Sequence, residues 1–371
     1  MQSSGIIIIG AGIAGVSAAA ELSTEAEVVL VEMEDQPGYH ATGRSAAYLA
    51  TSYGHPVVQA ITAACESFFA RPPKGFSDAP LLHPRDNIWF ARPDQADSLE
   101  AMRSENPRLE YVDAEAIRGR VPVFAPGYLL GGLWDHHGGD LDVDAILQGY
   151  LRLFRARGGR LINGHRVTGI RRELGQWRVR AGEVELTAPL LINAAGGWAE
   201  QVAALAGLAP VGLQALRRTA FTIDPPPGVE VGHWPEMVNI DEEFYFKPDA
   251  GLIMISPADE TPTVPTDAQP EEIDVATGVY RFEQATGLDV RRVRASWAGM
   301  RTFAPDRLPV CGFDPREEGF FWLAGQGGYG VMTAPALAQL ARYLVCGKEP
   351  EGDFAALLAY GDTLSPPRLL A

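Results

Sequence analysis

Three glycines near the N-terminus, Gly10, Gly12 and Gly15, have a spacing that lets a peptide backbone approach phosphate groups closely. Gly10 permits a tight turn, Gly12 admits a pyrophosphate, and Gly15 allows the next helix to pack closely on a strand. Glu32 follows 17 residues after Gly15, where a carboxylate can accept hydrogen bonds from a ribose. A dinucleotide site is therefore predicted, and its further members are Ile13, Ala14 and Met33.

The residues after Glu32 indicate which dinucleotide fits. No Lys or Arg occurs between Met33 and Tyr39, so a 2′-phosphate would meet only the acids Glu34 and Asp35, which argues against NADP. The next segment is rich in small residues whose backbone N–H groups suit a cofactor. We assign it to the cofactor site: His40, Ala41, Thr42, Gly43, Arg44, Ser45 and Ala46.

The elements that must hold these residues recur at three places. Ile6 to Ile9 and Val28 to Val31 are apolar runs typical of buried parallel strands, and a small-residue helix joins them. A similar pattern of strand, turn and helix occupies 189–198, and a third runs from 320 through the glycines of 325–330 to a helix ending near Cys346. Because an NAD dehydrogenase usually keeps its nucleotide domain in one block, this discontinuity favours a flavoprotein. The positive N-terminal end of the last helix suits the flavin N1–C2=O edge.

The predicted fold class is α/β: a Rossmann-like FAD-binding domain, discontinuous in sequence, with an α+β substrate domain built on a mixed β-sheet. The FAD-binding domain is predicted to comprise 1–78, 142–210 and 299–371, and the substrate domain 79–141 and 211–298. Further predicted helices cover 56–69, 113–119, 142–157 and 270–283. Two alternating runs joined at Gly175 predict a β-meander.

Composition limits the partners and the compartment. A chain of 371 residues suggests two domains, and a net charge of −16 argues against nucleic acid or an anionic membrane as a partner. The three cysteines, Cys65, Cys311 and Cys346, are too far apart to indicate a disulfide framework or a zinc site, so no metal and a reducing cytoplasm are expected. No apolar window is long enough to span a bilayer, and residues 5–20 lack the basic flank of a signal peptide.

With these motifs in place, the chain resembles the D-amino-acid oxidase and glycine oxidase superfamily of FAD enzymes, and within it most closely the bacterial D-arginine dehydrogenases. The similarity extends from one end of the chain to the other. The matching stretches are 10–15, 36–47, 141–151, 193–198, 244–251, 296–301 and 326–330.

The resemblance implies a flavin that oxidises an amine next to a carboxylate. A hydride leaves Cα for flavin N5, and the imino acid is hydrolysed to a 2-oxo acid, so the partners are a small amino acid and an electron acceptor, either oxygen or a carrier. Relatives with covalent flavin use a cysteine near the clamp arginine or a histidine after the first βαβ unit. Residues 299–305 contain no cysteine, and although His40 falls in the second region, the resemblance favours non-covalent FAD.

The resemblance also assigns roles to individual residues. Arg301 becomes the principal clamp for the substrate carboxylate, with Arg218 and the Tyr245 hydroxyl beside it, although neighbouring Arg217 is an alternative to Arg218. Tyr53 lies over the substrate. Ala46, Val238 and the backbone of Gly328 also contact it. Further cofactor contacts are Val167, Ala195, Gly196, Trp198, Gly299, Gly325, Gly327, Gly328, Tyr329, Gly330 and Val331.

Departures from the D-arginine dehydrogenase pattern cluster where the substrate side chain would be recognised. Asn87 replaces a glutamate that meets a cationic tail, Tyr48 replaces a histidine, Ala50 a threonine and Met332 a glutamine, whereas Glu236 replaces a methionine. Losing a buried charge partner costs about 2 to 5 kcal/mol, so we predict a D-amino acid with a neutral, apolar or aromatic side chain.

Three alternatives remain open from the sequence. In the first, Glu236 replaces the missing acid and preserves basic substrates. In the second, the substrate is an N-substituted amino acid, as for glycine or sarcosine oxidases, or a 2-hydroxy acid. In the third, the chain is a flavin-fold binding protein without redox activity. The intact glycine turn, Glu32 and Arg301 argue against the last of these. The sequence does not distinguish an oxidase from a dehydrogenase, and it does not give the oligomeric state.

Overall fold

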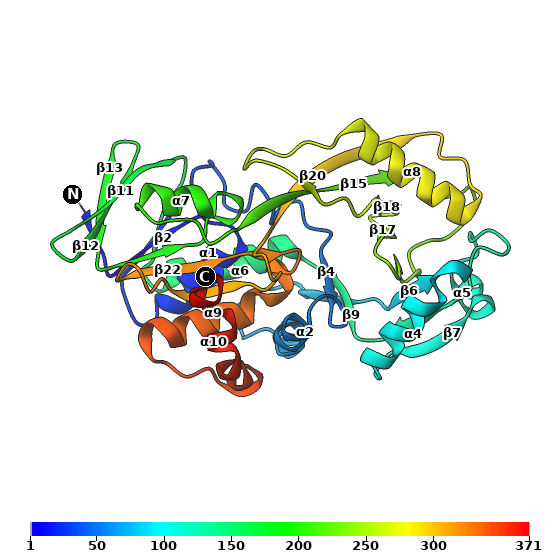
Figure 1. Cartoon of the computed structure of the whole chain (residues 1–371), viewed down its shortest axis with the longest axis horizontal. Coiled ribbons are helices and arrows are strands. Elements are labelled where there is room, and N and C mark those ends of the chain that lie inside the picture. Colours follow the sequence, from blue (N-terminus) through cyan, green and yellow to red (C-terminus); the bar gives the residue numbers. More distant parts are fainter. Residues whose placement is uncertain (1, 371) are drawn as a thin grey trace.

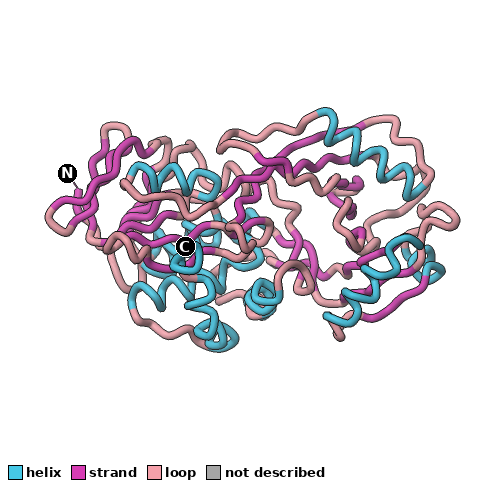
Figure 2. The backbone as a smooth tube through the Cα atoms, viewed as in Figure 1, coloured by secondary structure: helices cyan, strands magenta, loops and turns pink. Residues whose placement is uncertain are grey.

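The computed structural model describes residues 2–370 as an elongated molecule with two lobes (Figure 1). One lobe holds both termini, and the other is built from segments in the middle of the chain. The long strands β15 (Gln214–Ile223) and β20 (Val293–Phe303) run from one lobe into the other. In Figure 2 the helices of the second lobe lie at its outer edges.

A six-stranded sheet forms the core of the first lobe. Its order is β10 (Arg160–Ile162), β3 (Val28–Val31), β2 (Ile6–Ile9), β14 (Leu190–Asn193), β22 (Phe320–Ala324) and β21 (Val310–Phe313). All neighbours pair in parallel except β21, which is antiparallel to β22. Every residue of β2, β3 and β22 is buried, as expected for parallel strands covered on both faces.

Helices cover one face of this sheet, and a second sheet covers the other. Helix α1 (Ile13–Leu22) packs between α6 (Val143–Ala156) and α9 (Gly330–Cys346). The opposite face carries α7 (Ala199–Leu205) and a small sheet of β1 (Gln2–Ser3), β13 (Val184–Ala188), β12 (Gln176–Ala181) and β11 (Val167–Glu173). The predicted meander is present: β11 and β12 pair antiparallel, and Leu174 and Gly175 have positive φ in the turn between them. Strand β13, which continues the meander, was not predicted.

The second lobe is built on a ten-stranded mixed sheet. Its order is β23 (Gln326–Gly327), β20, β15, β18 (Leu252–Ser256), β17 (Tyr245–Asp249), β16 (Glu236–Asn239), β6 (Asn87–Ala91), β8 (Gly131–Asp135) and β7 (Glu110–Asp113), with β19 (Thr261–Pro262) paired to β15. Only β16 and β6 pair in parallel. The remaining helices of this lobe are α4 (Ala96–Glu105), α5 (Ala114–Arg120) and α8 (Glu272–Thr286), and α8 lies on β15 and β18.

Two features link the lobes. Strand β23, in the second glycine-rich loop, pairs with β20, so this loop belongs to the edge of the ten-stranded sheet as well as to the start of α9. A three-stranded sheet of β4 (Tyr48–Ala50), β9 (Gly138–Leu141) and β5 (Leu82–Pro84) lies at the junction. The domain segments remain a prediction; their boundary at 298/299 falls inside β20.

The structure corrects two local predictions. The helix predicted over 56–69 is divided into α2 (Pro56–Ala63) and α3 (Glu66–Ala70), because the Cys65 N–H bonds to the Thr62 carbonyl and tightens the last turn of α2. Helix α4 was not predicted; its mostly polar sequence buries only Leu99 among its ten residues. The C-terminal segment adds α10 (Gly361–Leu364) between two 3₁₀ helices, Gly352–Tyr360 and Pro366–Leu369. Among residues 2–370 no helix has both the length and the apolar character needed to cross a membrane.

Candidate active site

A long cavity lies over the carboxyl ends of β2, β3 and β14, where the glycine turn begins. Its wall includes Gly10, Gly12, Glu32 and Trp198. The carboxyl edge of a parallel sheet is where nucleotides bind in open α/β folds. The position of the cavity and the residues of its wall thus suit a dinucleotide.

Buried Glu32 fixes the backbone at one end of this cavity. One carboxylate oxygen accepts a hydrogen bond from the Ala11 N–H at 2.7 Å, and the other accepts one from the Glu34 N–H at 2.9 Å. Each oxygen keeps a second lone pair that a ribose hydroxyl can use. Thr42 closes the start of α1 in a similar way, since its hydroxyl accepts a hydrogen bond from the Ile13 N–H at 3.0 Å.

The glycines show that the turn has room for a ligand. Gly10 has φ +101°, and a Cβ there would lie 2.5 Å from the Ala194 carbonyl oxygen, whereas a Cβ on Gly15 would lie 1.8 Å from the Gly10 carbonyl oxygen. These two glycines are therefore required for packing. A Cβ on Gly12 would come no closer than 3.4 Å to another group, so its backbone borders open space.

Two buried polar atoms in this cavity wall lack hydrogen-bond partners within the described part of the chain. They are Nδ1 of His40 and Nε2 of Gln326. The His40 ring is fixed by Glu34, 2.8 Å from its Nε2, and lies 4.5 Å from the Trp198 ring. Because unpartnered buried polar groups are rare, a ligand with hydrogen-bonding groups along its length fits this wall.

A second cavity continues from the first. Both are lined by Ile13, Ala41, Thr42, Met300, Gly327 and Gly330. Gly330 is the first residue of α9, so the positive end of this helix lies where the two cavities meet.

Arginine and tyrosine side chains form a polar cluster in the second cavity. Arg301 donates a hydrogen bond to the Tyr53 hydroxyl at 3.2 Å, and this hydroxyl donates to Glu242 at 3.1 Å. Burial raises the pKa of Tyr53, so its hydroxyl keeps its proton at neutral pH. A Cβ on Gly328 would lie 2.8 Å from Cζ of Arg301, so Gly328 lies directly against the guanidinium.

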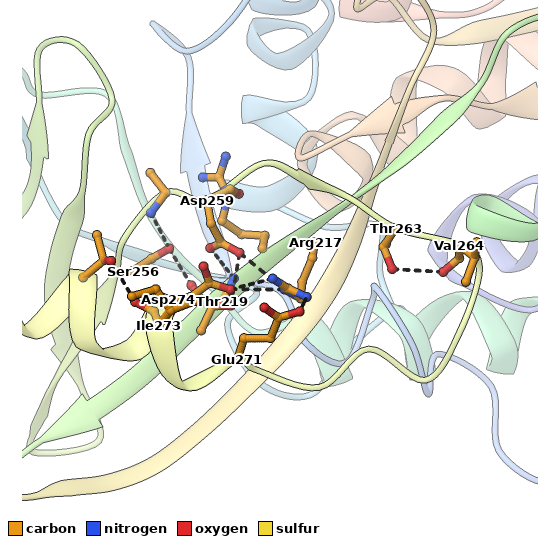
Figure 3. A network of polar contacts seen from close by, with 12 residues as sticks. Arg217, Thr219, Ser256, Asp259, Thr263, Val264, Glu271, Ile273 and Asp274 are labelled. Carbon is orange, nitrogen blue, oxygen red and sulfur yellow. Dashed lines mark hydrogen bonds and ion pairs between the residues drawn. The ribbon is translucent and has the colours of Figure 1, made fainter.

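Strand alternation decides which of two adjacent arginines reaches this cavity. Arg218 lies opposite Gly299 in the pairing of β15 with β20, and Arg301 is two residues beyond Gly299, so Arg218 and Arg301 project from the same face. Arg217 projects from the other face, where Asp274 lies 2.8 Å from its Nη2 and Glu271 also binds it (Figure 3). The structure thus places Arg218, not Arg217, in the cavity wall.

The same alternation places residues of three neighbouring strands in this wall. Residues 87 and 89 of β6, 236 and 238 of β16, and 245 of β17 line the cavity. The residues between them, such as Ile88, Met237 and Phe246, pack into the apolar core on the opposite face. One face of the ten-stranded sheet therefore forms the wall of the cavity.

Glu236 and Asn87 form a buried polar pair in this wall. They are register partners, and the Asn87 amide donates a 3.1 Å hydrogen bond to the Glu236 carboxylate. Burial raises the pKa of Glu236 to about 7, against the lowering effect of the Lys247 charge. Lys247 itself is bound by Asp140 at 2.5 Å. The Asn87 carbonyl oxygen has no partner among residues 2–370.

The predicted substrate residues all line the second cavity. They are Ala46, Tyr48, Tyr53, Asn87, Arg218, Glu236, Val238, Tyr245, Arg301, Gly328 and Met332. Tyr48 is partly fixed by its hydroxyl, which donates to the Arg85 carbonyl at 2.6 Å. The roles of these residues remain predictions.

The predicted cofactor residues divide into three groups. The first cavity is lined by Gly10, Gly12, Ile13, Ala14, Glu32, Met33, His40, Ala41, Thr42, Val167, Ala195, Gly196, Trp198, Gly327 and Gly330. The second is lined by Arg44, Ser45, Ala46, Gly299, Gly328 and Val331. Gly15, Gly43, Gly325 and Tyr329 lie outside both walls. Gly15 and Gly43 instead permit close backbone packing, as a Cβ on Gly43 would lie 2.8 Å from the Gly38 carbonyl oxygen.

The structure also adds residues that the sequence analysis did not identify. The first cavity includes His165, Arg166, Gln201, Thr302 and Gln326, and the second includes Trp89, Ala220, Glu242 and Ala258. Trp89 and Ala220 could have been inferred, since each lies two residues from a predicted site residue on the same strand. Glu242 lies in the turn between β16 and β17 with φ 54°, and no sequence pattern indicates it.

Comparison with known proteins defines the class to which this fold and site belong. Residues 5–344 match the family described as FAD dependent oxidoreductase (DAO), so the chain belongs to this family. The predictions of an enzyme, of FAD and of the fold class are therefore confirmed. The structure shows no cluster of three metal-ligating side chains among its described residues.

Individual relatives cover most of the chain at low identity. Glycine oxidase of Pseudomonas putida is 24% identical over 371 residues, covering 93% of this chain and 95% of the relative. Mitochondrial sarcosine dehydrogenase of Homo sapiens is 25% identical over 62% of this chain and 27% of the relative. The crystal structure of glycine oxidase from Geobacillus kaustophilus has a TM-score of 0.83 at 20% identity and covers 96% of this chain and 98% of that structure.

Proposed function

We propose that this protein catalyses the FAD-dependent oxidative deamination of a D-amino acid. The observation that carries the proposal is the Arg301 and Tyr53 pair, placed in a cavity that continues into the dinucleotide cavity at Gly327 and Gly330. A guanidinium fork in a cavity wall is well suited to hold a carboxylate. The glycine and sarcosine oxidising relatives are consistent with an amine next to that carboxylate.

The chain's residues orient the substrate and hold its charges. Arg301 binds the carboxylate, and Arg218 and the Tyr245 hydroxyl lie on the same wall to assist it. The FAD, which we propose to be held without a covalent bond, supplies the acceptor for the hydride that leaves Cα. The neutral amine would lose a proton to water, and hydrolysis of the imino acid would then give a 2-oxo acid and ammonia. The main contribution of the protein is positioning.

We propose a neutral side chain for the substrate as the first candidate. Trp89, Val238 and Met332 give this part of the wall an apolar character, and Tyr48 adds an aromatic ring. Asn87, where the D-arginine dehydrogenase pattern has a glutamate, carries no charge.

The Glu236 carboxylate favours a second candidate, a substrate with a cationic side chain. Its hydrogen bond comes from the neutral Asn87 amide, while Lys247 is bound by Asp140. The unpartnered Asn87 carbonyl oxygen beside it can accept one more N–H donor. A cation at this point would satisfy both groups and keep Glu236 ionised at neutral pH.

An N-substituted amino acid and a 2-hydroxy acid remain alternatives, because both carry the carboxylate that the clamp would bind. A substrate panel under anaerobic conditions tests all candidates together. Wild-type holoenzyme is mixed with D-amino, L-amino, N-methyl and 2-hydroxy acids, and bleaching of the flavin absorbance is recorded. We expect D-amino acids to bleach it fastest. Faster bleaching by L-amino or hydroxy acids would overturn the proposal. Admitting air afterwards separates an oxidase from a dehydrogenase.

A further inference from the structure

Glu260 joins two arginines that come from different elements. Its Oε1 accepts a hydrogen bond from Arg218 at 3.0 Å and one from Arg307 at 2.8 Å, and its Oε2 accepts a second bond from Arg307 at 3.0 Å. Arg307 thus binds the carboxylate with two N–H groups, and Arg218 shares one of its oxygens. These charges hold the pKa of Glu260 below its usual range although burial opposes the shift, so the carboxylate is ionised at neutral pH.

Arg307 is itself anchored next to the carboxylate clamp. Its guanidinium lies 3.9 Å from the centre of the Phe303 ring, and Phe303 is two residues beyond Arg301 at the end of β20. The Phe303 ring in turn lies 6.1 Å from that of Tyr329, whose ring is 5.2 Å from Tyr53. Arg307 therefore links Glu260 to the end of the strand that carries Arg301.

The segment that contains Glu260 also fixes a second atom of Arg218. The Asp259 carbonyl accepts a hydrogen bond from Nε of Arg218 at 2.7 Å. Two of the three guanidinium nitrogens are therefore fixed, and Nη1 has no hydrogen-bond partner among residues 2–370. Arg218 lines the second cavity, and its Nε and Nη2 are the nitrogens bound by the segment of Asp259 and Glu260.

We propose that Glu260 is a positioning residue, which holds the Arg218 guanidinium at the wall of the substrate cavity so that Nη1 can bind the substrate carboxylate. Arg307 fixes Glu260 for this purpose. The inference rests on the proposed function, because it takes the substrate to be a carboxylate. Glu260 does not touch the substrate in this arrangement and acts through Arg218.

The neighbouring arginine supplies a matched control. Glu271 binds Arg217 (Figure 3) as Glu260 binds Arg218, but Arg217 is on the opposite face of β15, away from the cavity. Replacing Glu271 therefore removes a carboxylate from an arginine of the same strand without reaching the substrate. The Glu260 side chain is 31% exposed and that of Glu271 is 57% exposed.

The experiment compares Glu260→Ala, Arg307→Met and Glu271→Ala as holoenzymes with the wild type. We expect KM for the best amino acid of the panel to rise about threefold to tenfold in the first two variants, since the lost contact is charged but partly exposed. We expect kcat to stay within about twofold, because a carboxylate contact made equally before and during the reaction affects binding alone. Glu271→Ala is expected to keep the wild-type KM.

A titration of the bound flavin with benzoate, a carboxylate without an amine, measures the same binding without turnover. The dissociation constant should rise in parallel with KM in Glu260→Ala and Arg307→Met. Wild-type values in Glu260→Ala, an equal rise in Glu271→Ala, or tighter binding in Glu260→Ala would overturn the inference. If no amino acid bleaches the wild-type flavin, the proposed function fails, while the benzoate comparison still decides the role of Glu260.

Discussion

The Asn87 amide donates a hydrogen bond to the Glu236 carboxylate at 3.1 Å, from the neighbouring parallel strand of the ten-stranded sheet. The two residues are 149 positions apart in sequence. Their pairing means that the wall of the second cavity carries an acid even though position 87 is an amide. Substrate charge preference, stability and pH dependence should all depend on this pair.

Replacing Glu236 by Gln should stabilise the protein at high pH. Burial raises the folded-state pKa of Glu236 from 4.5 to about 7. The protonated carboxyl group therefore contributes to the free energy of unfolding in full below pH 4.5, and this contribution is lost as the pH rises through 7. Gln has the shape of the protonated acid. We expect the free energies of unfolding of wild type and Glu236→Gln to be similar at pH 4.5 and to differ by about 3 kcal/mol at pH 8.5, with the variant more stable. Urea denaturation at both pH values measures this. Equal stabilities at pH 8.5 would contradict it.

The pH dependence of substrate affinity distinguishes the two candidate side chains. The measured quantity is the ratio of kcat/KM for a cationic D-amino acid to kcat/KM for a neutral one. This ratio should rise between pH 6 and pH 8 as Glu236 ionises. Glu236→Gln should remove this rise and lower the relative kcat/KM for the cationic substrate at pH 8 by at least about tenfold. The neutral D-amino acid serves as the internal control. A constant ratio across this range would show that Glu236 does not meet the substrate.

Arg301→Lys should reduce kcat/KM by about a hundredfold or more while FAD remains bound. Lysine keeps the charge but lacks the planar pair of donors that a carboxylate accepts, and it cannot reproduce the contact with Tyr53 in the same geometry. Steady-state kinetics with the best amino acid gives the size of the effect, and the flavin-to-protein absorbance ratio checks cofactor content. A loss of less than threefold would remove Arg301 from its role as the clamp.

Gly328→Ala should impair the carboxylate clamp without unfolding the protein. The added Cβ would lie 2.8 Å from Cζ of Arg301, so the guanidinium must shift. We expect KM to rise about tenfold or more with a small change in Tm. Gly119→Ala is the matched control, because a Cβ at this position in α5 would meet nothing within 4 Å. Equal KM values in the two variants would argue against this contact.

Acid precipitation should release the flavin into the supernatant. In the structure His40 is fixed by Glu34 on Nε2, and its ring lies beside Trp198 in the first cavity. Our proposal of non-covalent FAD predicts a colourless pellet for both the wild type and His40→Ala. A yellow wild-type pellet that becomes colourless in the variant would instead identify His40 as an attachment site.

The sequence was sufficient for the features that depend on local pattern. The apolar runs of β2 and β3, the glycine spacing and Glu32 together specify a buried parallel unit with a phosphate-binding turn, because each feature acts within about 30 residues of chain. The resemblance then supplied eleven substrate residues, and the structure places all of them in one cavity wall. A mostly polar helix such as α4 gives a weak signal, since Leu99 is the one buried residue among its ten.

Only the tertiary structure decided which side chains meet. Arg217 and Arg218 are indistinguishable in sequence, and the register of β15 against β20 turns only Arg218 toward the cavity. The contact of Glu236 with Asn87 likewise depends on β16 and β6 being neighbours in the sheet. The contact of Glu260 with Arg307 depends on two loops lying side by side. Strand order and register are set by burial of the whole sheet, and a shift of one residue would exchange its two faces. For this reason the glycine turn and Glu32 could be recognised in the sequence, whereas the partners that fix each charged side chain of the second cavity could not.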